Sequence, residues 1–134
     1  MIVDTQYLGA LADQNAAARE KAAELSDTAV PVRVPTAVVW EAYTGLGNIA
    51  FESDATALRR LYERLLRSHS SLEMTPEVAK RAGELNGTQM NSDTRSQLDG
   101  ADSVVAAHGL LLGEPVISND SDFRDVEGLE VVTY

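Results

Sequence analysis

Apolar residues follow two different spacings along this 134-residue chain. Tyr7, Leu8 and Leu11 fall on one face of a helix, and the alanine-rich stretch 16–25 continues as a second helix. Short apolar runs between helical segments predict strands. The strand positions are Ile2 and Val3; Val30, Val32 and Val34, with Pro31 at the start or at an edge; 72–74; Val116 and Ile117; and Leu129, Val131 and Val132.

Strands that alternate with helices are typical of a parallel sheet. We therefore predict an α/β fold of three layers, in which helices flank a central parallel β-sheet. The length suits one domain, and no repeat, linker or low-complexity tract divides the chain. Residues 1–134 are expected to form this single domain.

Proline, glycine and capping residues mark the ends of the remaining helices. The predicted helices run from Pro35-Thr36 to Gly45 or Gly47, from a cap at Ser53 or Asp54 through Leu58, Leu61, Leu65 and Leu66, from Thr75-Pro76 to about Asn86, and from about 101 to Leu112. Gly87 is the expected stop of the third, and segment 87–98 is expected to be a loop or a poorly ordered helix extension. Gly113 is the expected left-handed end of the last helix, because Pro115 cannot extend it.

Composition excludes several kinds of site. The chain has no cysteine, so disulfides and thiolate metal sites are impossible. Its start lacks a basic region and a cleavage site, and no apolar run approaches the ~20 residues that a membrane span needs. A cytoplasmic location without membrane contact is therefore expected.

The net charge of −10 is unusual for a protein that binds nucleic acid, because phosphate binding normally leaves a basic surface. Only Lys21 and Lys80 are lysines, and the acidic residues spread along the whole chain. This pattern suggests a halophilic protein from a high-salt cytoplasm. In molar salt the Debye length is roughly 3 Å, so repulsion between an acidic surface and a polyanion is largely screened.

Several acidic residues lie where a ligand site is expected. Asp4 ends the first strand, Glu41 lies in an otherwise apolar helix, Asp102 lies in the first turn of another helix, and Asp120 and Asp122 follow a buried strand. In open α/β sheets, ligands bind at the carboxyl ends of the strands. Oxygen ligands alone suit Mg²⁺ or Mn²⁺.

Each acid also has a purely structural interpretation. Asp4 can cap the following helix, for which Thr5 is also available, Asp99 and Asp102 resemble a capping box, and Asp120 and Asp122 can be turn formers. Trp40 and Tyr43 are expected in the core, and Glu41 is expected to be largely buried beside them. His69 and His108 are expected to be structural.

The order of these acids resembles that of PIN domains, and of the VapC ribonuclease toxins in particular. The similarity rests on Met1-Ile2-Val3-Asp4-Thr5, on Trp40-Glu41, on Asp102 with Val105-Ala106-Ala107, and on Pro115-Val116-Ile117-Ser118-Asn119-Asp120 with Asp122-Phe123. It covers essentially the whole chain. The usual Thr-x-Asp/Asn setting of the last acid appears here as Ser118-Asn119-Asp120.

The resemblance implies an endoribonuclease that holds up to two Mg²⁺ or Mn²⁺ ions and leaves 5′-phosphate and 3′-hydroxyl ends. Asp4, Glu41, Asp102 and Asp120 would be catalytic and metal-binding, Asp122 would be a reserve metal ligand, and Asp99 would be only a cap. RNA would be the substrate, a short antitoxin protein the partner, and a homodimer the common assembly, with the helix 58–66 as one candidate surface.

Other functions remain open from the sequence alone. A haloacid dehalogenase-like phosphatase needs a second aspartate two residues after the first, where this chain has Gln6. A receiver domain needs a lysine after a late strand, and no lysine follows Lys80. A PIN nuclease of RNA processing and a PIN-like module that only binds protein are the remaining alternatives.

Overall fold

A parallel sheet lies at the centre of the molecule. The computed structural model describes residues 1–90, 98 and 100–134, and within them five strands are ordered β3-β2-β1-β4-β5. The strands are β1 (Ile2–Val3), β2 (Arg33–Pro35), β3 (Ser70–Leu72), β4 (Val116–Ile117) and β5 (Val131–Val132), and every pairing is parallel. Because β1 is the middle strand, the residue that follows it has neighbouring strands on both sides.

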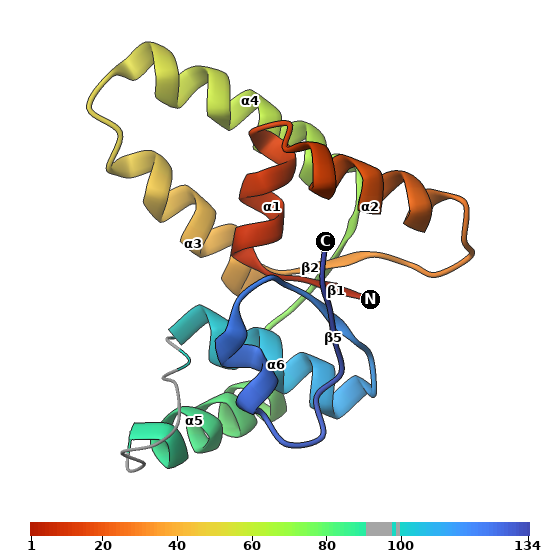
Figure 1. Cartoon of the computed structure of the whole chain (residues 1–134). Helices are drawn as coiled ribbons and strands as arrows, with labels where there is room; N and C mark the ends of the chain where they lie inside the picture. The colour runs from red at the N-terminus through yellow and green to blue at the C-terminus, as the bar shows by residue number, and fades with distance from the viewer. Residues whose placement is uncertain (91–97, 99) are drawn as a thin grey trace.

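Helices cover both faces of this sheet. They are α1 (Thr5–Ala12), α2 (Ala16–Ser26), α3 (Thr36–Gly47), α4 (Glu52–Ser68), α5 (Pro76–Met90) and α6 (Gly100–Leu112), with a short 3₁₀ helix, η1 (Ser121–Asp125). Helices α1 to α4 gather on one side, and α5 and α6 lie on the other (Figure 1). The predicted three-layer α/β fold is confirmed. No helix among the described residues is long and apolar enough to cross a membrane.

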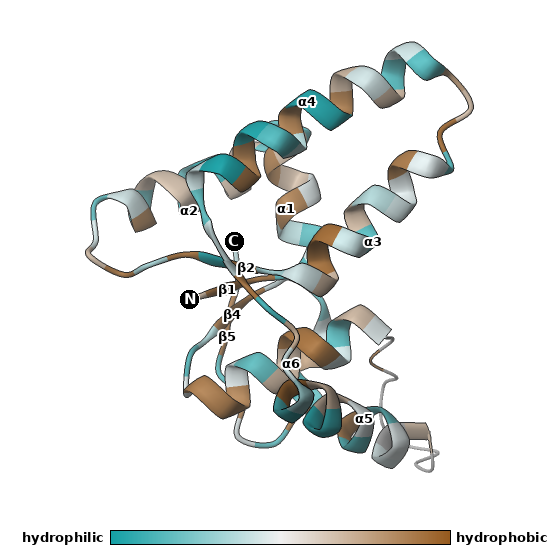
Figure 2. Ribbon diagram, turned by 180° about the vertical axis from the view of Figure 1, so that it is seen from behind, coloured by the Kyte–Doolittle hydropathy of each residue, from teal (hydrophilic) through white to brown (hydrophobic). Residues whose placement is uncertain are grey.

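Burial on both faces explains the composition of the strands. Ile2, Val3, Val116 and Ile117 are all buried, so the middle of the sheet has consecutive apolar residues in place of an alternation. These strands stand out as brown segments at the centre of the molecule (Figure 2). A smaller cluster, formed by Val78, Ala82, Val104 and Ala107, joins α5 to α6.

The strand boundaries differ from the prediction on one side of the sheet. β2 begins at Arg33, and Val30, expected within it, is 45% exposed. β3 covers 70–72, two residues before the predicted 72–74. The pairing of Arg33 with Ser70 and of Pro35 with Leu72 sets both strands. Hydrogen bonding to a neighbouring strand, and not the local apolar spacing, therefore decides where these short strands lie.

One helix start and one helix end also differ. At α1, Asp4 is the cap, as one of the two interpretations from the sequence expects, and Thr5 is not. The residue before α4 is Phe51, which makes no side-chain capping bond, so Ser53 and Asp54 lie inside the helix. Thr75 does cap α5, since its hydroxyl accepts from the Val78 N–H, but α5 continues through Gly87 to Met90. Residues 91–97 of the expected loop, and Asp99, lie outside the described part of the chain.

The end of α6 follows the sequence closely. Gly113 has φ +62°, the left-handed conformation expected there, and β4 begins three residues later. One turn earlier, Gly109 lies against the end of the sheet. A Cβ atom on Gly109 would lie 3.1 Å from the Glu114 carbonyl oxygen and 2.4 Å from Leu129 Cδ1. The close approach of α6 to this turn therefore requires glycine at position 109.

We predict opposite effects of alanine at two helical glycines. Gly109→Ala should lower the free energy of unfolding by about 1–3 kcal/mol, because the added methyl group overpacks a backbone contact. Gly83→Ala, in α5 with open space around its Cα, should raise it by about 0.5–1 kcal/mol through helix propensity. Urea denaturation measures both. A stabilising Gly109→Ala would show that α6 does not pack this closely.

Candidate active site

Asp4 is a buried carboxylate at the end of the middle strand. It is 1% exposed, and its Oδ1 accepts the Tyr7 N–H at 2.6 Å, which caps α1. The simple capping role considered from the sequence is therefore present. It does not account for the burial, because a cap normally lies at the surface, and a buried charge is unfavourable unless it is compensated.

The pKa of Asp4 shows which groups surround it. Its surroundings raise this pKa from 3.8 to about 6, and burial is the largest cause. Hydrogen bonds from the Ser118 side chain and the Tyr7 N–H act to lower the pKa, whereas the negative charges of Asp120 and Glu41 act with burial to raise it. Glu41 on α3 and Asp120 in the turn after β4 therefore both lie within electrostatic reach of Asp4, which follows β1.

Glu41 lies on α3, the helix that begins directly after β2. Its side chain is half-buried rather than largely buried as expected, and its Oε2 accepts a hydrogen bond from the Thr5 hydroxyl. Thr5 directly follows Asp4 at the start of α1. The segment that carries one of the acids, Asp4, therefore also bonds to a second one, Glu41. From the sequence, Thr5 is expected only as a possible cap, and no signal there indicates its contact with Glu41.

Asp120 lies in the turn between β4 and η1. Its N–H donates to Ser118 Oγ at 2.9 Å, and its own Oδ1 accepts the Asp122 N–H at 2.9 Å. The turn-forming interpretation of Asp120 is thus correct, and it coexists with proximity to Asp4. Asp122 lies in the first turn of η1 with a half-buried side chain. Ser118 contacts both Asp4 and Asp120, a role that the sequence analysis did not assign.

Asp102 reaches the same edge of the sheet through its helix. It lies in the first turn of α6 and is half-buried. Because α6 ends just before β4 begins, this helix runs opposite to the strands, and its first turn lies near their carboxyl ends. Asp99, expected to cap this helix, is outside the described residues.

The oxygen atoms of these acids fit a hard divalent cation by their chemistry, but they are not gathered into a finished site. No three acidic or histidine side chains among the described residues lie close enough together to hold a metal ion. Asp4, Glu41 and Asp120 each direct one oxygen to a donor of the protein. Carboxylate oxygens are the ligands that such a cation prefers, so the donor set is suitable in its chemistry.

The aromatic and histidine residues considered from the sequence include one that is exposed against expectation. Trp40 is 66% exposed, so the expectation that it belongs to the core is wrong. Tyr43 is partly buried, with its ring centroid 6.3 Å from that of Tyr62. His108 is buried beneath the sheet, and burial followed by the nearby Arg33 charge lowers its pKa. The Nδ1 of His69 lies 2.7 Å from the Leu65 carbonyl oxygen at the end of α4.

Comparison with known proteins identifies a family and a shared fold. The family model described as "PIN domain" matches residues 1–129. No curated protein sequence matches the chain. Among solved structures, VapBC2 of Rickettsia felis bound to a promoter DNA fragment superposes with a TM-score of 0.81 at 12% identity, over 99% of this chain and 97% of that one.

Two further structures show the same fold. DNA-bound VapBC of Salmonella typhimurium gives a TM-score of 0.76 at 15% identity, over 98% of this chain and 96% of that one. VapBC-1 of nontypeable Haemophilus influenzae gives 0.74 at 15% identity, with the same coverage of 98% and 96%. At such identities the likeness establishes the shared fold.

We predict that Asp4→Asn stabilises the metal-free protein at neutral pH. Asparagine keeps the cap and the shape but removes a buried charge. The rise in pKa from 3.8 to about 6 corresponds to at most about 3 kcal/mol of destabilisation above pH 6. The wild type regains this free energy as the pH falls from about 6 towards 3.8, because the folded state then binds the proton more tightly than the unfolded state.

Thermal melts in EDTA at about pH 7.5 and about pH 5 measure this difference. The melting temperature of Asp4→Asn should exceed that of the wild type at the higher pH, and the gap should narrow at the lower pH. Glu127→Gln removes one charge from an exposed position and serves as the matched control. Equal destabilisation of Asp4→Asn at both pH values would leave Asp4 as a cap alone.

Proposed function

Because this chain belongs to the PIN domain family, we propose that it is a metal-dependent endoribonuclease, the toxin of a toxin–antitoxin pair. The observation that carries the proposal is the buried Asp4 carboxylate with Asp120 and Glu41 close enough to raise its pKa. Folding places like charges together at a cost in stability, and such clusters are typical of cation and catalytic sites. A module that only binds protein would not need this arrangement.

The proposed ligands are Asp4 at the centre, with Glu41, Asp102 and Asp120 around it and Asp122 in reserve. Bound Mg²⁺ or Mn²⁺ would supply the Lewis acidity that activates water for in-line attack and neutralises the leaving 3′ oxygen. The residues of the chain provide the charge and its orientation. Asp4 must be ionised for this role, which its pKa of about 6 allows at neutral pH.

Neighbouring groups hold the acids at the sheet edge. The Thr5 hydroxyl fixes one oxygen of Glu41, and the Tyr7 N–H fixes one oxygen of Asp4. Ser118 bonds to the N–H of Asp120 and lies beside Asp4. These bonds limit the rotation of the three carboxylates, and Asp4, which has donors from both Tyr7 and Ser118, is held by two of them.

The proposed partner is an antitoxin, since solved structures with this fold include a toxin–antitoxin complex from Klebsiella pneumoniae and a member of the VapBC family of toxin–antitoxin systems from Mycobacterium tuberculosis. A homodimer is proposed as well. The helix suggested from the sequence as its surface offers little free apolar area, because Leu58, Leu61, Leu65 and Leu66 all pack against the core. The large exposed apolar side chains lie elsewhere and include Trp40, Phe51, Met74 and Met90.

We predict that the protein cleaves total RNA in the presence of Mn²⁺ and does not cleave it with chelator. Asp4→Asn, Glu41→Gln, Asp102→Asn and Asp120→Asn should each reduce the rate by at least about 100-fold, because each removes a proposed ligand. Asp122→Asn should have a smaller effect, and Asp99→Asn should keep most of the activity. Gel analysis of the products, with end mapping for 5′-phosphates, measures this.

Glu130→Gln provides a control for the loss of one negative charge, since Glu130 is exposed and follows no strand end. Cleavage by Asp102→Asn at the wild-type rate would remove that residue from the site. Cleavage that survives chelation would contradict the metal-dependent proposal.

We also predict that activity persists or rises towards molar KCl. RNA binding through phosphate contacts weakens with salt, but a chain of net charge −10 is stabilised when salt screens its own repulsion. The rate of RNA cleavage and the melting temperature of the protein, both measured across a KCl series, test this prediction. Maximal activity at about 50 mM salt, with loss above it, would contradict the proposed adaptation to high salt.

A further inference from the structure

An apolar pocket lies between the first turns of α3 and α6. Its volume is about 370 Å³, and no charged residue is among the described residues that line it. Trp40 and Met74 form its exposed rim, at 66% and 51% exposure, whereas Ala101 and Val104 are buried and form its floor. Trp40 and Met74, two of the large exposed side chains, therefore border a hollow and are not isolated on the surface.

This pocket adjoins the proposed active site. Trp40 directly precedes Glu41, and Ala101 directly precedes Asp102. Met74 lies two residues beyond the end of β3, and its N–H donates to Thr36 Oγ1, directly after β2, at 3.3 Å. The pocket therefore lies at the carboxyl edge of the sheet, on the β2–β3 side of Asp4.

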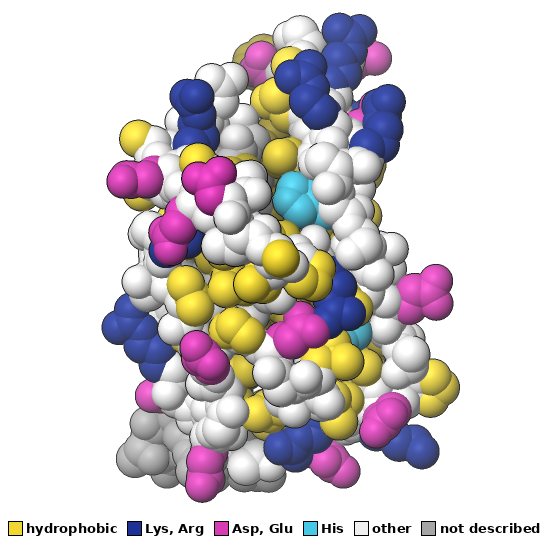
Figure 3. Space-filling view, turned by 90° about the vertical axis from the view of Figure 1, so that its right-hand side faces the viewer, with side chains coloured by type: hydrophobic (Ala, Val, Ile, Leu, Met, Phe, Trp, Pro, Cys, Tyr) yellow, Lys and Arg dark blue, Asp and Glu magenta, His cyan; other side chains and the backbone are white. Residues whose placement is uncertain are grey.

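The charge distribution limits what could enter this pocket from an RNA chain. The main concentration of basic side chains on the sequence is on α4, in Arg59, Arg60, Arg64 and Arg67, all exposed. Figure 3 shows Lys and Arg side chains gathered at the upper end of one face. None of these arginines lines the pocket. The carboxylates of Glu41 and Asp102, which follow lining residues in the chain, would repel a phosphate, whereas a neutral nucleobase meets the Trp40 ring and apolar walls.

We propose that this pocket binds an unpaired nucleobase of the RNA substrate, stacked on Trp40, next to the phosphodiester that is cleaved. The inference rests on the proposed nuclease function, and it names a binding residue that this function does not require. Aromatic stacking tolerates any base, because every base has a π face. It also gives a protein of strongly negative charge a source of RNA affinity that does not depend on cationic side chains.

Trp40 can report on its own ligand, because it is the only tryptophan in the chain. Adenosine is the probe: it has no phosphate, so it is neither repelled by the acids nor cleaved, and it needs no metal. Titrating the wild-type protein with adenosine in EDTA should quench the tryptophan emission in a saturable way. Ribose should not, since it has no base. Met74→Ala should weaken the quenching by removing the opposite wall.

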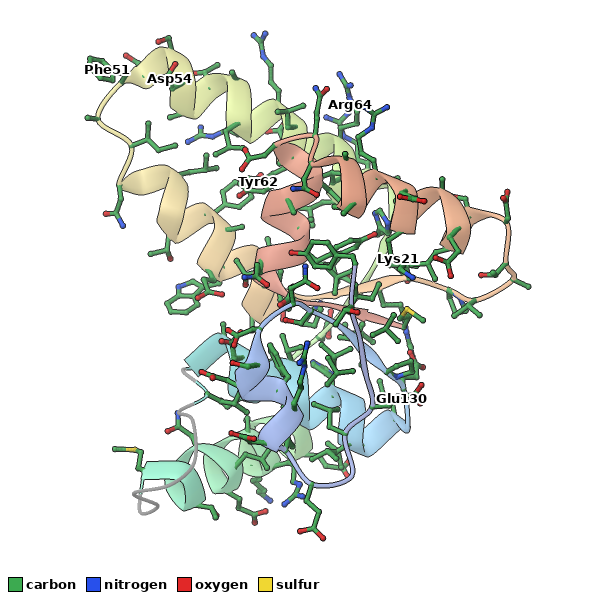
Figure 4. All side chains as sticks on the ribbon, viewed as in Figure 1. Lys21, Phe51, Asp54, Tyr62, Arg64 and Glu130 are labelled. Carbon is green, nitrogen blue, oxygen red and sulfur yellow. The ribbon has the colours of Figure 1, made fainter. Side chains whose placement is uncertain are left out.

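Cleavage kinetics supply the second measurement. Trp40→Ala should raise KM by about tenfold with little change in kcat, because a stacked base contributes binding rather than chemistry. Trp40→Phe keeps a ring and should stay within about threefold of the wild type. Phe51→Ala is the matched control and should be unchanged: Phe51 is 70% exposed and lies at the α3–α4 turn, far from the sheet (Figure 4).

The outcomes separate this inference from the nuclease proposal. If the protein cleaves RNA but adenosine leaves the emission unchanged and Trp40→Ala matches Phe51→Ala, the base pocket is wrong and the nuclease stands. If adenosine quenches the emission but no RNA is cleaved, the base pocket stands and the nuclease proposal fails. If the emission shifts on dilution of the protein without ligand, a second copy of the chain fills the pocket, and the inference is overturned.

Discussion

Asp4 holds a carboxylate at the end of the middle strand, where both neighbouring strands and the start of α1 exclude water. Without compensation such a charge would destabilise the fold by several kcal/mol. The chain compensates locally, with the Tyr7 N–H from α1 and the Ser118 hydroxyl beside the end of β4. Two other acids act in the opposite direction, because the negative charges of Asp120 and Glu41 disfavour the ionised form of Asp4. A carboxylate that only capped a helix would gain no stability from these neighbours, which is one of the grounds on which we propose a cation site here.

Charged groups at the amino ends of the strands are compensated in a different way from those at the carboxyl ends. Arg33, at the start of β2, is paired with Glu114, just before β4, so one ion pair spans the amino end of β1. His108 lies buried in this region, where desolvation and the Arg33 charge lower its pKa and favour its neutral form. The two ends of the same strands therefore carry opposite electrostatic arrangements. One end pairs two cationic groups, the Arg33 guanidinium and the Met1 ammonium, with Glu114, and the other end brings the carboxylates of Glu41 and Asp120 close to Asp4.

The fold followed from the sequence wherever a helix carried a clear apolar face or a stop signal. Helices α1, α2, α3 and α6 lie where periodicity, Pro35 and Gly113 placed them. The strands were less predictable because β2 and β3 are set by pairing with each other: the alternating Val30 and Val32 lie outside the sheet, whereas Ser70, with no apolar signal, lies within it. Trp40 was misassigned although its spacing carried the answer. Val38, Ala42 and Leu46 recur every four residues on the buried face of α3, and Trp40, two residues from Val38, points away from it.

The candidate site was predictable as a set of residues but not as an arrangement. Each of four acids lies beside the end of a strand or the start of a helix that the sequence predicts: Asp4, Glu41, Asp102 and Asp120. A parallel sheet brings the carboxyl ends of its strands to one edge, so these acids are expected near one another. Which oxygen bonds to which donor depends on side-chain rotamers, and the sequence carries no signal for the bond between Thr5 and Glu41. The bonds from Tyr7 and Ser118 to Asp4, and from Thr5 to Glu41, offset part of the cost of placing these like charges near one another. The protein can therefore keep the three acids near one another without a cation.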